Sequence, residues 1–378
     1  MSHTNQTIEI DPAGDIFLEV TEYDYSVKSA DDKRPVKQVV RFKVSKEILT
    51  NGSQNFKSLL DFHYRGSSSD VIKLDDETVL SSEVWLRYMH GKMIPTMYQI
   101  PIKEVWHVIA MGRKRFLENE KLNSWFACWM RSMGGHETSN FTLEELTVLM
   151  YPCEEFEHAY AFAEVTRRLA YGWAGHIWAK NPLAECGIYH LHLANRFMAA
   201  VNDARTGLKS KIHNPIWAAT ALFLESYQCS CKEKTHYEIS KSLHKTRVWP
   251  LEKHFYGPDA KSSDEILEAL KDFKYTPPAG SCANCRVDFK GNPVNLTIQN
   301  VRSSFHGLCL DCINTPSVGS IDEEARRHRR YRIPWDEGCT IRHGQPTWWY
   351  SALARSHGPD AHRRERDERR RLGKKTTT

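Results

Sequence analysis

The sequence lacks an apolar stretch long enough to cross a membrane, and it lacks a secretory leader. A membrane-spanning helix needs about 20 consecutive apolar residues, whereas no run of even 18 occurs among these 378 residues. Residues 1–10 are polar and have neither the basic start nor the apolar segment of a signal peptide. We therefore expect an intracellular protein without membrane contact, located in the nucleus, the cytoplasm or both.

Motifs of common enzyme classes are also missing. The chain has no Gly-rich phosphate loop, no Gly-x-Ser-x-Gly elbow and no His-Glu-x-x-His. Two Glu-x-x-His pairs occur, Glu155 with His158 and Glu233 with His236, but carboxylate-bridged metal pairs need two such pairs and two further Glu in one bundle. Because the second pair adjoins a Cys-x-Cys segment, we interpret both as coincidental and expect no enzyme.

Basic charge is concentrated near the end of the sequence. Residues 320–378 contain 15 Lys and Arg against 9 Asp and Glu, although the net charge of the whole chain is only +5. The excess lies in two arginine-rich stretches, Arg326–Arg332 and His362–Lys375. Apolar periodicity fails from Ser317 onward, so we expect residues 317–378 to be a basic, largely disordered tail. Such a tail is either simply solvated or serves as a nuclear-import signal or nucleic-acid arm.

Short strands and helices alternate between Gly14 and Arg131. Apolar and polar residues alternate in 15–20 and 38–44, and 71–74 is a third short strand. Helices are expected after Ser53 and Ser81, and around residues 105–110 and 122–130. Aromatic residues at helical spacing are interpreted as core, with an exposed partner-binding patch as the alternative. They are Trp85, Tyr88, Trp106, Phe116, Trp125, Phe126 and Trp129.

This order of elements resembles the BTB/POZ domain. The likeness lies in Gly14–Val20, Phe42–Leu49, Ile72–Asp76 and Trp85–Gly91, and it covers about a third of the chain. The resemblance implies a small mixed sheet flanked by helices, protein partners and a possible homodimer. It also makes an adaptor for a cullin-type ubiquitin ligase conceivable. In part of the family an N-terminal strand is exchanged between partners, and here only Thr7–Ile10 could supply one.

The whole chain is therefore expected to be an α+β protein in five parts. Residues 1–13 form an N-terminal tail, 14–133 the BTB/POZ-like domain, 140–228 an all-helical region, 229–316 a small Cys-rich zinc-binding module, and 317–378 the basic tail. Within the helical region we expect helices over 153–179, 183–205 and 216–227, which are interrupted at Asn181-Pro182 and Asn214-Pro215.

Cysteine spacing predicts a structural zinc site. The chain has ten cysteines, and without a secretion signal we expect reduced thiols and metal ligands rather than disulfides. Two Cys-x-x-Cys pairs, Cys282 with Cys285 and Cys309 with Cys312, have the spacing of a four-thiolate zinc site. The intervening segment has few large apolar residues, so zinc is expected to stabilise a separate small module.

The remaining cysteines leave alternatives open. Cys229 and Cys231 either belong to the same module or form a second site with a nearby histidine. The candidate histidines are His236, His244, His254 and His306. Cys339 and His343 have Cys-x-x-x-His spacing but lie in a poorly patterned stretch, so we do not assign them a metal. Cys128, Cys153 and Cys186 fall on helical patterns and are interpreted as ordinary buried cysteines.

Together these features predict a non-enzymatic protein–protein interaction protein, an adaptor or scaffold, with a structural zinc module. The alternative is a nuclear regulator of transcription type that contacts nucleic acid through the zinc module or the basic tail. An affinity for nucleic acid that falls steeply with salt would distinguish the second hypothesis from the first.

Overall fold

The computed structural model describes residues 6–25, 34–66, 70–135, 138–225, 228–286, 289, 293–314 and 339–341. These residues divide into two compact units. Unit 1 comprises the described residues of 6–161 and 179–193, and unit 2 comprises those of 162–178 and 194–341. The predicted basic tail lies outside the described residues except for positions 339–341. No helix in the described part of the chain is both long enough and apolar enough to cross a membrane.

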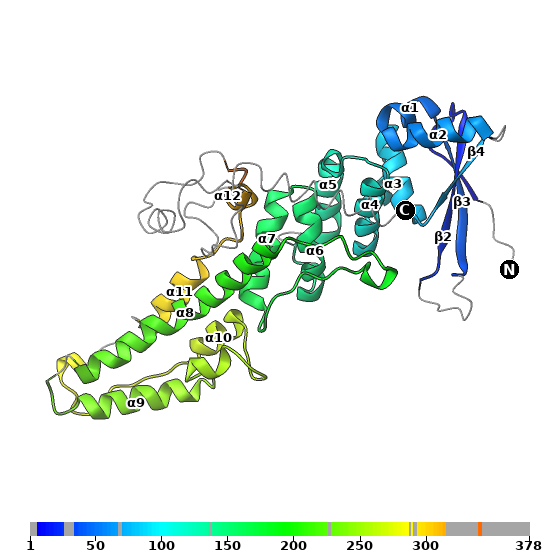
Figure 1. The fold of residues 1–378 in the computed structure, drawn as a ribbon. Helices are drawn as coiled ribbons and strands as arrows, with labels where there is room; N and C mark the ends of the chain where they lie inside the picture. Colours follow the sequence, from blue (N-terminus) through cyan, green and yellow to red (C-terminus); the bar gives the residue numbers. More distant parts are fainter. Residues whose placement is uncertain are drawn as a thin grey trace, which may run out of the picture. The chain divides into compact units, whose positions relative to one another are not determined.

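Unit 1 is built on a four-stranded mixed sheet (Figure 1). Its strands are β1 (Gln6–Glu9), β2 (Ile16–Tyr23), β3 (Val36–Val44) and β4 (Val71–Asp75), in the order β1-β3-β2-β4. β2 and β3 pair antiparallel, whereas β1 on β3 and β4 on β2 pair parallel. Alternate residues of β2 are buried, as the period-2 pattern predicts. The three predicted strands are confirmed, and β1 shows that part of the predicted N-terminal tail belongs to the sheet.

α-Helices form most of the remainder of unit 1. They are α1 (Lys46–Gly52), α2 (Gln54–Gly66), α3 (Val79–Met89), α4 (Ile102–Lys114), α5 (Asn123–Gly134) and α6 (Leu143–Glu155). Side-chain caps set several starts: the Ser45 hydroxyl accepts from the N–H of Ile48 at the start of α1, and Thr142 forms a capping box with Glu145 at the start of α6. Local sequence chemistry thus fixes where these helices begin.

Four tryptophans form the core between these helices, and each indole N–H is satisfied. Trp85, Trp106, Trp125 and Trp129 are all buried. Their indole nitrogens donate to the carbonyls of Val108, Val148, Met97 and Ile100, over 2.8, 3.1, 3.0 and 2.8 Å. Buried tryptophan needs such a partner. These residues are core, as predicted, and they do not form an exposed patch; Phe116, by contrast, is 47% exposed.

Unit 2 is organised along one long helix, α8 (Asn195–Glu225). α7 (Ala159–Gly172) enters the unit, α9 (Lys232–Lys245) runs back beside α8, and α10 (Ser263–Lys271) and α11 (Asn295–Arg302) pack on it (Figure 1). The short α12 (Leu310–Asn314) follows. The Cys-rich segment shares this core, because Phe289 contacts Phe223 and Phe273. It is therefore not packed as a separate small module.

The structure corrects three helix predictions. The helix expected over 153–179 is instead the end of α6 at Glu155 followed by α7, and residues 173–179 are not helical. Residues 183–194 are not an α-helix; they contain only a single 3₁₀ turn, Ala184–Cys186. Conversely, α8 continues through Pro215, although an interior proline costs about 3 kcal/mol. Ile212 and Ile216 flank the proline and are fully buried, and burial of each contributes about 1.5–3 kcal/mol. Core packing therefore outweighs the missing hydrogen bond.

Glu155, the first residue of a Glu-x-x-His pair, is a structural anion in the core of unit 1. Its carboxylate accepts two hydrogen bonds from the Arg113 guanidinium, at 3.2 and 2.6 Å. Asn119 Nδ2 and the Tyr151 hydroxyl donate to it at 2.9 and 3.1 Å. Both charged side chains are less than a tenth exposed. The pair thus depends on these hydrogen bonds, because neither charge is solvated.

We predict that Glu155→Ala lowers the free energy of unfolding by roughly 3–5 kcal/mol, because it leaves a buried guanidinium without its carboxylate. Urea denaturation followed by tryptophan fluorescence measures the change. Glu118→Ala is the matched control: Glu118 pairs with Lys121 on the surface, where an ion pair contributes at most about 1 kcal/mol. Equal effects of the two substitutions would contradict the buried-anion role.

Candidate metal centre

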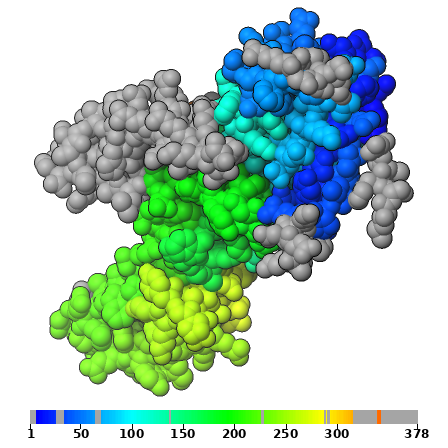
Figure 2. All heavy atoms as spheres, turned by 45° about the vertical axis from the view of Figure 1, so that its right-hand side comes forward, coloured from blue at the N-terminus to red at the C-terminus, as the bar shows by residue number. Residues whose placement is uncertain are grey.

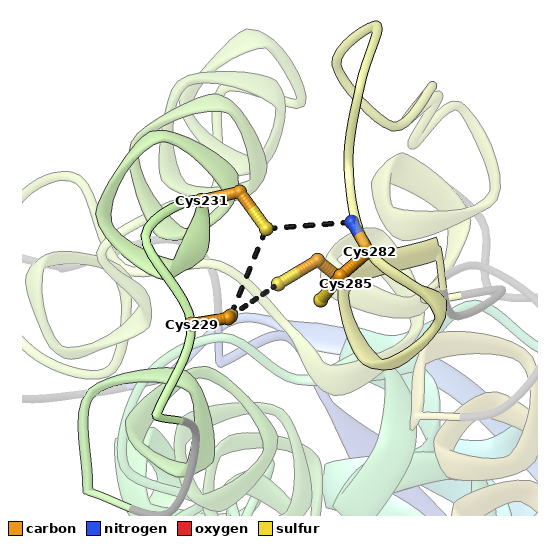
Figure 3. Close-up of side chains that lie close together, drawn as sticks. All are labelled: Cys229, Cys231, Cys282 and Cys285. Atoms are coloured by element: carbon orange, nitrogen blue, oxygen red, sulfur yellow. Dashed lines mark hydrogen bonds between the residues drawn. The ribbon is translucent and has the colours of Figure 1, made fainter.

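Four cysteine thiols converge in unit 2. The Sγ atoms of Cys229, Cys231, Cys282 and Cys285 all lie within 4.8 Å of one another. Cys229 Sγ is 3.5 Å from Cys285 Sγ and 3.7 Å from Cys231 Sγ. Figure 3 shows the side chains pointing toward a common centre from two segments of the chain. We call this group the four-thiol cluster.

The first half of the four-thiol cluster is the connection between α8 and α9. Cys229 lies in the turn after α8, and Cys231 is the residue that immediately precedes α9. The N–H of Thr235 donates to the Cys231 carbonyl at 3.0 Å, which is the first hydrogen bond of α9. The start of α9 therefore fixes the backbone at Cys231, and the Cys-x-Cys spacing places Cys229 in the same turn.

The second half is a tight turn around Cys282 and Cys285. Gly280 has φ of +80°, a conformation that favours glycine, and it leads into the 3₁₀ turn Ala283–Arg286. The N–H groups of Cys285 and Arg286 both donate to the Cys282 carbonyl, at 3.0 and 3.1 Å. Arg286 Nε also donates to the Ser281 carbonyl at 2.7 Å. The Cys-x-x-Cys spacing thus forms the knuckle that zinc sites use.

The sulfur spacing matches a tetrahedral metal site. A Zn–S bond of about 2.3 Å gives S···S edges of about 3.8 Å in a regular tetrahedron. The separations of 3.5 and 3.7 Å lie close to this value, whereas a disulfide requires about 2.05 Å. None of the ten cysteines is in a disulfide. The donor set therefore fits a thiophilic divalent metal ion.

The electrostatics of the four thiols are uneven. The Cys285 N–H holds the pKa of Cys282 down to about 7, whereas burial raises the pKa of Cys285 to about 12. Burial also raises the pKa of the Cys229 thiol. A bound cation reverses this by stabilising thiolates outright. Since four thiolates would occupy every position of a tetrahedral ion, the site is of the closed, structural kind.

A second group, Cys309, Cys312 and Cys339, also converges, and we call it the three-thiol cluster. Its Sγ atoms lie within 4.8 Å of one another. The predicted grouping of Cys282 and Cys285 with Cys309 and Cys312 around one ion is therefore wrong. Each Cys-x-x-Cys pair belongs to a different cluster.

The reason for the separate clusters is the length of α8. The four-thiol cluster follows its last residue, Glu225. The three-thiol cluster is tied to its first turn, because Arg196 NH1 donates to the carbonyl of Ile313 at 3.1 Å. A helix of 31 residues is about 46 Å long. The spacer between the two pairs contains α11, which packs along α8 instead of folding back into a compact turn.

The other predicted candidates fall as follows. Cys229 and Cys231 are in the four-thiol cluster, so the alternative that joined them to the Cys-rich segment is the one the structure supports. None of the four candidate histidines belongs to a cluster among the described residues. Cys339, which the sequence left unassigned, joins the three-thiol cluster, while His343 lies outside the described residues. Cys153 is buried, whereas Cys128 and Cys186 are half-buried and belong to neither cluster.

Unit 1 contains a cavity of about 240 Å³ between α3, α4 and residues 186–190. Two histidines and a thiol line it. Burial lowers the pKa of His107 to about 4 and also lowers that of His190, while burial raises the pKa of Cys186. In each case burial disfavours the charged form, which is opposite to the thiolate–imidazolium pair that activates a cysteine nucleophile.

Comparison with protein-family models, with curated proteins and with solved structures finds no match for this chain. The fold and the site therefore define this protein only by its general structural class. The chain is an α+β protein with a small mixed sheet, and its described residues include two cysteine clusters that could hold metal ions.

We predict that Cys229→Ser removes one equivalent of bound zinc from protein purified without chelator, because a tetrahedral site loses one of its four thiolates. The melting temperature of unit 2 should fall with it, since metal binding contributes folding free energy. Elemental analysis and differential scanning calorimetry measure the two effects.

Cys128→Ser is the matched control, since Cys128 is a half-buried thiol outside both clusters. It should leave the zinc content unchanged. The same experiment separates the observed cluster from a four-thiolate site made by Cys282, Cys285, Cys309 and Cys312 alone, in which Cys229 is not a ligand. Unchanged zinc content in the Cys229→Ser protein would refute the four-thiol site.

Proposed function

We propose that this chain is a non-enzymatic protein–protein interaction protein. Unit 1 would act as a BTB/POZ-like binding domain, and unit 2 would be a helical body stabilised by zinc, which together suit an adaptor or scaffold. A cullin-type ubiquitin ligase is one class of partner that the resemblance implies. The observation that carries the proposal is the open edge of the sheet in unit 1.

The order of elements in unit 1 supports the BTB/POZ-like assignment. Two antiparallel strands precede a helical pair, α1 and α2, and β4 then adds to the sheet in parallel before α3, α4 and α5 follow. This is the order that the sequence resemblance led us to expect. The buried tryptophans leave this fold well packed, so binding would use its edges and surfaces rather than a loose core.

β1 is the outermost strand of the sheet, and its far side has no strand partner among the described residues. Ile10 N–H donates to the Lys43 carbonyl of β3. Because successive residues of a strand alternate in direction, the N–H groups of Thr7 and Glu9 point away from β3. Figure 2 shows the blue N-terminal strands at the surface. Such an edge accepts a strand from a partner chain.

The four-thiol cluster supports a binding role for unit 2. A zinc ion held by four thiolates has no open position for substrate or water, so it would stabilise the fold without performing chemistry. It would fasten the α8–α9 turn to the segment around Cys282, which lies 51 residues further along the chain than Cys231. This arrangement holds a helical surface in place without a large apolar core.

We predict that the full chain self-associates through the β1 edge and that Thr7→Pro weakens this association. Proline removes an N–H that points away from β3, so it should disturb a partner strand more than the sheet itself. Sedimentation equilibrium at tens of micromolar is suitable, because interfaces of roughly 8 kcal/mol have micromolar dissociation constants.

Ile8→Pro is the matched comparison, since the N–H of Ile8 points toward β3 by the same alternation. It should destabilise unit 1 itself, whereas Thr7→Pro should leave the melting temperature nearly unchanged. A wild-type chain that remains strictly monomeric over this concentration range would count against the self-association.

A second candidate function is contact with nucleic acid, and one face of α9 favours it. Lys234, Tyr237, Lys241 and Lys245 are exposed and recur every three or four residues, so they lie along one side of the helix. Tyr237 is 62% exposed, which suits stacking on a base. Glu238 lies in the same stripe and pairs with Lys241 at 3.7 Å. The stripe is still net basic, because its lysines outnumber this one glutamate.

If α9 contacts phosphates, Lys234→Glu combined with Lys241→Glu should weaken binding to a labelled single-stranded oligonucleotide. The slope of log affinity against log salt should fall by about 0.7 for each lost phosphate contact. Fluorescence anisotropy across a salt series measures it. Lys271→Glu, an exposed lysine on α10, is the control and should have little effect. Equal slopes for all three proteins would exclude α9 as the contact.

A further inference from the structure

We propose that the three-thiol cluster binds a second thiophilic divalent ion, of zinc type, which fastens residues 339–341 to α12. This site is separate from the four-thiol cluster and does not depend on the interaction function proposed above. It also gives a role to Cys339, a residue in a stretch without secondary-structure pattern.

The geometry of the thiols carries the proposal. Cys309 and Cys312 are buried, Cys339 is half-buried, and Cys312 Sγ lies 3.6 Å from Cys339 Sγ. This separation is far from the disulfide bond length of about 2.05 Å and close to the S···S edge of about 3.8 Å in a tetrahedral zinc site. Three thiols from two distant segments thus meet at metal-ligand spacing.

The platform that carries two of these thiols is held by the helices of unit 2. Arg196 NH2 donates to Asn314 Oδ1 at 2.8 Å, and the N–H of Leu308 donates to Thr166 Oγ1 at 2.8 Å. Gly307 has φ of +95°, and a Cβ there would lie 1.9 Å from the Ala163 carbonyl oxygen. The segment before Cys309 therefore approaches α7 more closely than any side chain permits, which fixes the position of the Cys-x-x-Cys pair.

The third thiol is positioned in part by contacts of the residues that follow it. Asp311 Oδ2 accepts the N–H of Thr340 at 2.7 Å and lies 3.9 Å from Cys309 Sγ. Ile341 is only 5% exposed. A carboxylate beside the thiols that orients a neighbouring ligand segment is typical of the shell around a metal site. These contacts bring Cys339 to α12 across 27 residues of sequence.

Three thiolates supply three of the four positions of a tetrahedral zinc ion. The fourth position would then be open to solvent or to a further ligand. An ion here would close a loop between Cys312 and Cys339, and loop closure restricts the unfolded chain. The ion would therefore stabilise the attachment of residues 339–341.

The test counts zinc in the full chain after reconstitution with zinc chloride under reducing conditions and desalting. The wild-type protein should hold two equivalents, and Cys282→Ser and Cys339→Ser should each hold one. The double variant should hold none, because the losses add when the sites are independent. Cys128→Ser should keep two. One equivalent in the wild type, or two in Cys339→Ser, would overturn the proposal.

A second variant tests whether the loss of zinc from the Cys339→Ser protein is caused by misfolding. Asp311→Asn keeps the shape of the side chain and all three thiols, so it should weaken zinc binding at this cluster by about 10–100-fold. The four-thiol cluster should be unaffected. Competition with a chromophoric zinc chelator measures both affinities. If both sites weaken together, the clusters are not independent and the proposal fails.

Cobalt substitution identifies the ligands. Co²⁺ bound to Cys282→Ser protein reports the second cluster, and its thiolate charge-transfer bands should match three sulfur ligands. Absence of thiolate charge-transfer bands in Cys282→Ser protein, with bands present in Cys339→Ser protein, would show that only the first cluster binds metal.

Discussion

The burial of one side of α8 is the interaction on which unit 2 depends. Apolar residues recur along this side from Phe197 through Leu208 and Ile216 to Phe223, and all are buried. This packing allows the helix to continue through Pro215, where the sequence predicts an interruption. It also determines the cysteine partners, because the two ends of α8 lie about 46 Å apart and each end collects its own group of thiols.

Unit 1 is stabilised in a different way. Its sheet is small, and the helices beside it bury four tryptophans whose indole N–H groups reach backbone carbonyls. A buried Arg113–Glu155 pair with four donated hydrogen bonds adds directional constraints. Aromatic packing and satisfied polar groups together specify one arrangement. The edge strand β1 has one side without a strand partner among the described residues, and this is why we place the proposed interaction there.

The two cysteine clusters have complementary consequences for unit 2. The four-thiol cluster would fasten the α8–α9 turn to the segment around Cys285, where the aromatic cluster of Phe223, Phe273 and Phe289 provides a modest core. The three-thiol cluster would attach residues 339–341 at the other end of the helix. Metal binding would in both cases join segments that contribute few apolar residues, which is the usual use of structural zinc in proteins with small cores.

Local chemistry in the sequence determined the strands β2, β3 and β4, the helix starts at Ser45 and Thr142, and the two Cys-x-x-Cys knuckles. Each of these depends on residues within a few positions of one another, through alternation, capping or tight turns. Only the tertiary structure decided which knuckle shares a cluster with which partner. Spacing within a knuckle is local, but the meeting of Cys282 with Cys229, or of Cys312 with Cys339, depends on the path of α8 and α11, and that path is set by core packing across distant parts of the chain.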